Sequence, residues 1–164
     1  MRGYREPGRR GGRGEWLVAV QVLLIALVLL GPRTGAGLPA WPPAAARAAR
    51  GAGLVLMAGG LALFLAGLAW LGPNLTPLPR PKVSGRLVQA GPYGWMRHPV
   101  YAGGIAIAFG WALWVAGWWT LLYALLLTVF LDFKAAREER WLREAFPEYR
   151  AYAARVRKFV PFIY

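Results

Sequence analysis

The residues best suited to chemistry lie in two short segments of the chain. The segment 91–101, GPYGWMRHPVY, holds His98, the single histidine, directly before a long apolar run. The segment 137–142, REERWL, places the adjacent carboxylates Glu138 and Glu139 where another apolar run ends. Titratable groups are costly to hold at the ends of membrane segments, so both segments are candidates for function.

The composition is typical of a membrane protein. Hydrophobic residues make up 57% of the 164 residues, and they gather in long runs. The chain has no cysteine, which excludes disulfides, thiol nucleophiles and thiolate metal sites, and a lone histidine argues against a zinc site. We therefore expect no metal. Because the Lys and Arg residues behind the net charge of +13 flank the apolar runs, we expect contact with anionic lipid headgroups and not with nucleic acid.

Four apolar runs predict an all-α protein with about four transmembrane helices, at 16–31, 51–72, 99–116 and 118–135. The first run, from Trp16 to Leu30, is fifteen residues long. As a helix they would cover about 22 Å, which is less than a hydrocarbon core of about 30 Å.

Two features predict how these helices pack. The last two runs are separated by only two residues, which predicts a tight antiparallel helical hairpin. Three tryptophans at its turn are typical of a membrane interface. The second run is rich in glycine, and small residues let membrane helices approach closely. Its glycines are Gly51, Gly53, Gly59, Gly60 and Gly67.

The distribution of basic residues predicts a topology. Segments on alternating sides of the four runs carry seventeen and three Lys and Arg residues. The positive-inside rule then places both termini and the loop 73–98 in the cytoplasm, together with the two candidate segments. An alternative remains open, because the N-terminal arginines and the apolar core 17–30 are also typical of a cleavable signal peptide.

The chain is expected to be one domain with three parts. These are a basic N-terminus at 1–15, two membrane helices within 16–72, and a functional core at 73–164. From 137 to 159, apolar residues recur at helical spacing between basic ones, which predicts an amphipathic helix at the membrane interface. Pro147 should break this helix into two pieces.

Spacing alone leaves two interpretations of the carboxylates. Asp132 and Glu139 share one face of a helix, whereas Glu138 points about 100° away. In the first interpretation they line a pocket. In the second they form helix salt bridges at i,i+4, which would join Glu139 to Arg143 and Glu138 to Lys134. Asp132 lies inside an apolar run and needs a partner or a water-filled cavity in either case.

His98 likewise has two interpretations. Pro99 favours a helix beginning at this point, and His98 would then be a solvated helix-terminal residue. The free N–H groups of a helix start also suit a carboxylate or phosphate, and Arg97 adds positive charge. Tyr93 and Tyr101 could line the same site or belong to an interfacial aromatic belt.

These motifs together resemble a known superfamily. GPYGWMRHPVY, a helical hairpin, an EExxL segment and then FPEYRAY follow one another at the intervals typical of the isoprenylcysteine carboxyl methyltransferase and phospholipid methyltransferase superfamily. The resemblance covers roughly residues 74–161. It implies an integral membrane protein that uses S-adenosylmethionine to transfer a methyl group to a lipophilic or membrane-associated carboxylate, amine or thiol. With the topology predicted above, we expect a multi-pass protein of the inner membrane whose site faces the cytoplasm.

The resemblance also implies which residues form the site. Around the RHP motif, the implied cofactor-binding residues are Tyr93, His98, Pro99, Tyr101, Gly103 and Gly104. From the EExxL segment they are Glu138, Glu139 and Leu142. The implied catalytic residues are Arg97, Glu138 and Glu139. The chain departs from the family pattern at Pro147, where glycine is usual, and at Arg157 and Lys158, either of which could replace a family arginine.

Two alternatives from other classes remain. The C-terminal segment from Arg155 to Tyr164, with GWMRHPVY, also resembles NADPH-dependent sterol reductases, although Gly104 replaces an acidic residue frequent there. A non-catalytic membrane protein could use the same scaffold. Titration with S-adenosylhomocysteine and with NADPH distinguishes the three.

Overall fold

The computed structural model describes residues 14–35, 37–74, 86–161 and 163–164, and within these ranges it is helical without a β-strand. The all-α prediction is thereby confirmed. The helices are α1 (Glu15–Leu30), α2 (Pro43–Leu71), α3 (Pro99–Trp114), α4 (Trp118–Ala145) and α5 (Tyr149–Arg155), with the short 3₁₀ turns η1 (Gly72–Asn74) and η2 (Gly91–Gly94). The basic segment predicted at 1–15 lies outside the described residues except for its last two.

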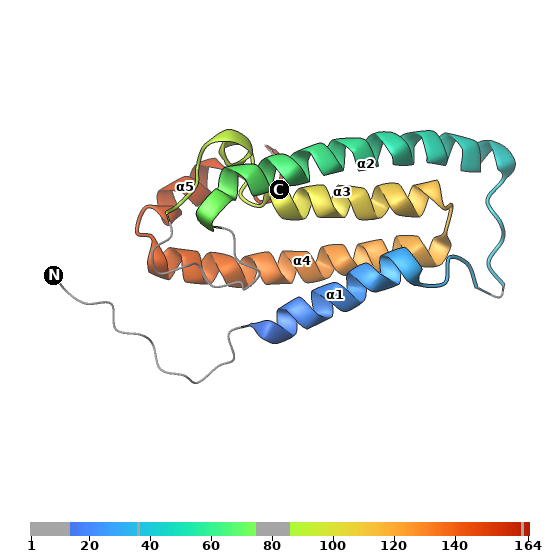
Figure 1. Ribbon diagram of the computed structural model, residues 1–164, viewed down its shortest axis with the longest axis horizontal. Coiled ribbons are helices and arrows are strands. Elements are labelled where there is room, and N and C mark those ends of the chain that lie inside the picture. The colour runs from blue at the N-terminus through green and yellow to red at the C-terminus, as the bar shows by residue number, and fades with distance from the viewer. Residues whose placement is uncertain (1–13, 36, 75–85, 162) are drawn as a thin grey trace.

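The four long helices lie side by side in the order α2, α3, α4, α1 (Figure 1). Two of them are long and apolar enough to cross a membrane: α2 with its 3₁₀ extension, Pro43–Asn74, and α4. The helices α1 and α3 are apolar but shorter, at 16 residues each. This confirms a helical membrane fold with a short first helix.

Two predicted boundaries were wrong. The second helix begins at Pro43 and not at residue 51. Proline is favoured in a first turn, and the alanines and arginines that follow it are good helix formers, although the two arginines lie outside the apolar run. The fourth helix continues beyond residue 135 to Ala145, so the Glu pair lies on α4. The predicted interfacial helix is therefore the last turns of α4 followed by the short α5, with the break at Phe146–Glu148, around Pro147 as expected.

Glycines bring α2 and α3 into backbone contact. A Cβ atom added to Gly60 would lie 2.8 Å from the Gly103 carbonyl oxygen, and one added to Gly103 would lie 2.6 Å from the Gly60 carbonyl oxygen. Gly53 meets α3 in the same way, whereas Gly51 and Gly59 face open space. The predicted close approach is confirmed, and α3 is the partner.

The predicted hairpin between α3 and α4 is also confirmed. Its turn is tight enough to hold Ala116 at a φ of 48°. Trp118 at the start of α4 donates its indole N–H to the Pro39 carbonyl at 3.0 Å. The hairpin turn lies at one end of the bundle, while η2, the start of α3, the end of α4 and α5 all lie at the other (Figure 1).

Candidate active site

The backbone of the C-terminal segment holds the RHP segment in place at the start of α3. The Arg97 N–H donates to the Arg157 carbonyl at 2.8 Å, and the His98 N–H donates to the Lys158 carbonyl at 3.1 Å. Pro99 follows as the first residue of α3. Residues that are far apart in the sequence thus meet at the end of the bundle where α4 also ends.

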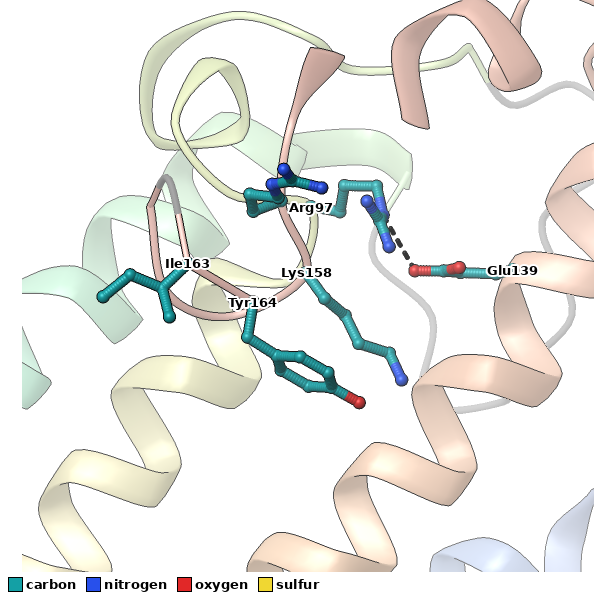
Figure 2. Close-up of a pocket in the computed structure, with 6 residues that line it drawn as sticks. Arg97, Glu139, Lys158, Ile163 and Tyr164 are labelled. Carbon is teal, nitrogen blue, oxygen red and sulfur yellow. Dashed lines mark hydrogen bonds and ion pairs between the residues drawn. The ribbon is translucent and has the colours of Figure 1, made fainter. Parts of the chain in front are cut away.

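Glu139 lies at the centre of the site and is only 4% exposed. Its Oε1 accepts a hydrogen bond from Arg97 Nε at 2.9 Å and lies 3.2 Å from His98 Nε2 (Figure 2 shows the Arg97 contact). Arg97 Nη1 also donates to the carbonyls of Val156 at 2.5 Å and Ala153 at 3.2 Å. The guanidinium therefore joins α4 and the RHP segment to α5 and to the residue that follows it.

Glu138 lies on the other side of His98. The Tyr101 hydroxyl donates a hydrogen bond to Glu138, and His98 Nδ1 is 3.9 Å from Glu138 Oε2. The rings of His98 and Tyr101 are stacked, with centroids 5.5 Å apart and planes within 3° of parallel. The imidazole is thus held between the two carboxylates, and the structure brings together the five predicted residues Arg97, His98, Tyr101, Glu138 and Glu139.

One of the two predicted helix salt bridges forms. Arg143 Nη2 binds Glu139 Oε2 at 3.1 Å, so Glu139 takes part in the i,i+4 pair as well as in the site. The predicted pair of Lys134 with Glu138 was wrong. Lys134 Nζ instead donates to Gln21 Oε1 of α1 at 2.5 Å.

Asp132 finds the partner that a charge in an apolar helix requires. Lys158 Nζ forms an ion pair with Asp132 Oδ1, and the Tyr164 hydroxyl donates to the same oxygen at 3.0 Å. Lys158 is 9% exposed. In contrast, Arg157 is exposed, and its guanidinium forms no hydrogen bond or ion pair with the described residues.

A pocket of about 250 Å³ lies beside this ion network (Figure 2). Its lining residues are Arg97, Glu139, Arg157, Lys158, Ile163 and Tyr164. The sequence identified Arg97 and Glu139 and raised Arg157 and Lys158 as alternatives. It missed Ile163 and Tyr164, because nothing in their spacing shows that the chain turns back on α4. Within the described ranges, no group of three His, Asp or Glu side chains is placed to hold a metal ion.

Several predicted site residues have structural contacts instead. The Tyr93 hydroxyl donates to the Gly67 carbonyl of α2 at 3.3 Å, and its own carbonyl accepts from the Tyr152 hydroxyl at 2.7 Å. Burial, and next the charge of Glu138, raises the pKa of Tyr93 to about 12, so the hydroxyl stays a donor. Tyr93 therefore connects η2 to α2 and α5.

The remaining predicted residues lie outside the pocket lining. Pro99 and Gly103 are buried, and Gly103 packs on α2. Gly104 has open space where a Cβ would be. Leu142 is half-buried on α4, where its carbonyl accepts the N–H of Phe146 at 2.8 Å.

Tyr149 is a buried residue of this region that sequence analysis did not assign to the site. It is 1% exposed, and its hydroxyl has no hydrogen-bond partner among the described residues. Burial, followed by the charge of Glu139, raises its pKa, and Arg97 acts in the opposite direction. A protonated phenol without a partner thus lies within electrostatic range of the Arg97–Glu139 pair.

The family model for phospholipid methyltransferases matches residues 49–149, which contain both motif segments and the hairpin that connects them. The chain belongs to the phospholipid methyltransferase family. This family is part of the isoprenylcysteine and phospholipid methyltransferase superfamily, so the resemblance is confirmed. Phospholipid methyltransferases are membrane methyltransferases, and α2 and α4 give this member a membrane location. The match leaves out α1 and the segment after residue 149. No curated protein matches the chain.

Proposed function

We propose that the chain transfers a methyl group from S-adenosylmethionine to a lipophilic acceptor in the membrane. One observation carries this proposal. The carboxylate of Glu139 is held by Arg97 and His98, and all three residues lie in the part of the chain that matches the family. Beside them is a pocket lined by three cationic side chains.

The chemistry of the pocket fits the amino-acid part of this cofactor, which carries a carboxylate and an ammonium group. Arg157 lines the pocket with a guanidinium that has no partner among the described residues and suits the carboxylate. Glu139, which also lines the pocket, and Glu138, on the other side of His98, are acceptors for the ammonium. The Tyr149 hydroxyl, which has no hydrogen-bond partner among the described residues, is a further polar group of this region. The pocket has a volume of about 250 Å³, whereas ligand sites typically have about 300–1,000 Å³. The pocket therefore matches only part of the cofactor.

The cofactor supplies a methyl group on a sulfonium, which is already a strong electrophile. The chain therefore needs mainly to align the reactants and exclude water. Arg97 fixes Glu139 against the segment after α5, and His98 sets the separation of the two carboxylates. If the acceptor is an amine, Glu138 accepts its proton, because Glu139 is already ion-paired with Arg97 and Arg143. A thiolate or carboxylate acceptor needs no base.

We further propose a multi-pass topology in the inner membrane with this site on the cytoplasmic side. The excess of Lys and Arg, seventeen against three, supports it. The arrangement of α3, α4 and α5 is consistent, because their functional ends lie at the same end of the bundle (Figure 1). The polar cofactor would then enter from the cytoplasm and the acceptor from the lipid between helices.

The proposal is tested by calorimetric titration of the purified chain in detergent. We expect S-adenosylhomocysteine to bind and NADPH not to bind. If the folded protein binds neither S-adenosylhomocysteine nor NADPH, it is a non-catalytic protein with the same fold. If it binds only NADPH, its chemistry is that of a reductase. Either result would overturn the proposed function.

A further inference from the structure

Lys134 is a cation in the interior of the bundle. It lies on α4, one helical turn before Glu138, and is 4% exposed. An ammonium group among apolar helices is costly to bury unless an acceptor compensates its charge. The acceptor that binds Lys134 therefore determines where this positive charge lies relative to its neighbours on α4.

The acceptor is Gln21 of α1, whose Oε1 lies 2.5 Å from Lys134 Nζ. Gln21 is the only polar residue between Trp16 and Leu30. The ammonium also lies 5.3 Å from the centroid of the Tyr101 ring, which adds a cation–π contact. Since α1 lies outside the family match at 49–149, this contact connects a helix outside the match to a residue inside it.

A competing acceptor is available to Lys134. Glu138 is at i+4 on the same helix, where oppositely charged side chains attract each other, and the attraction is stronger away from water. No ion pair joins these two described residues. Glu138 instead accepts a hydrogen bond from the Tyr101 hydroxyl and lies near His98.

We propose that Gln21 is a positioning residue for the methyltransferase site, because it holds Lys134 away from Glu138. Without Gln21, the buried ammonium would turn to the Glu138 carboxylate, which lies at i+4 on the same helix. Glu138 then leaves Tyr101 and His98, and its charge is no longer available to the cofactor. This inference rests on the proposed role of Glu138 in cofactor binding.

The test compares S-adenosylhomocysteine affinity, measured by calorimetry in detergent, for the full chain and four variants. Gln21→Met keeps the side-chain length and removes the acceptor, and it should weaken binding by about tenfold, as expected for the loss of one charge-assisted hydrogen bond. Gln21→Glu keeps an acceptor oxygen and should bind like the native protein. Lys134→Met removes the ammonium and should also bind nearly as the native protein does.

The double variant Gln21→Met/Lys134→Met is decisive. If Gln21 acts by holding Lys134, removing the lysine should restore the affinity that Gln21→Met loses. If Gln21 only anchors α1, the double variant should bind no better than Gln21→Met, and that result would overturn the inference. Native affinity in Gln21→Met would also overturn it. A native chain that fails to bind would instead contradict the proposed function itself.

Should Gln21→Met fail to fold, Lys134→Met and Gln21→Glu still decide the matter. Affinity close to native in both supports the inference, whereas a large loss in Lys134→Met, at an unchanged melting temperature, contradicts it.

Discussion

Arg97 and Glu139 form an ion pair between the segment that leads into α3 and the last turns of α4. Arg97 Nε lies 2.9 Å from Glu139 Oε1, and the two side chains are 14% and 5% exposed. The pair joins the two motif segments and, through the carbonyls of Ala153 and Val156, the C-terminal segment as well. Removing one member of a largely buried pair leaves the other charge uncompensated, so this contact is the most sensitive point of the site.

Glu139→Gln should weaken S-adenosylhomocysteine binding by about ten- to a hundredfold. The substitution keeps the side-chain shape but removes the charge that Arg97 and His98 contact, and a lost charge-assisted hydrogen bond costs about 1.5–3 kcal/mol. Glu144→Gln is the matched control, because Glu144 is exposed on the same helix, where ion pairs contribute little. If calorimetry finds equal effects of the two substitutions, Glu139 has only a structural role as a salt-bridge partner.

His98→Asn should weaken binding of the same ligand by about tenfold while α3 remains helical. His98 occupies the N-cap position of α3, yet its side chain forms no capping hydrogen bond and lies between the two carboxylates. Asparagine is a good cap residue, so it would preserve the helix start without bridging Glu138 and Glu139. An unchanged dissociation constant, measured with an unchanged melting temperature, would show that His98 does not serve the site.

Arg157 and Lys158 should respond differently to substitution by glutamine. Arg157→Gln should weaken ligand binding and leave the melting temperature unchanged, because this guanidinium lines the pocket without a partner among the described residues. Lys158→Gln should lower the melting temperature, because it leaves Asp132 of α4 without its cation. Thermal unfolding and calorimetry on both variants test this assignment, and the reverse pattern would make Lys158 the ligand-binding cation.

Gly103→Ala should destabilise the protein, whereas Gly104→Ala should not. A Cβ at Gly103 would lie 2.6 Å from the Gly60 carbonyl oxygen, and a Cβ at Gly104 would meet open space. Forcing such a contact in a packed interior costs about 1–3 kcal/mol. Melting temperatures in detergent measure the difference. If Gly103→Ala melts like the native protein but binds ligand poorly, the resemblance was right to place Gly103 in the cofactor site and not in the packing.

The sequence by itself predicted the helical membrane fold and the residues that gather at the site. Long apolar runs have few alternatives to helices, because every backbone N–H and C=O in a membrane needs an internal partner. A two-residue turn between the last two runs left only an antiparallel hairpin. The RHP motif and the Glu pair were recognisable because they are charged where charge is costly, at the ends of those runs.

Only the tertiary structure decided which partner each charge takes. The i,i+4 rule describes neighbours on one helix, and it correctly predicted the pair of Glu139 with Arg143. It could not predict that Lys134 would bind Gln21, because Gln21 lies on another helix, α1. In the same way, no local pattern showed that Lys158 would reach Asp132 or that Gly103, and not Gly104, would face α2. A buried charge binds the acceptor that packing brings nearest, and that acceptor depends on how distant helices meet.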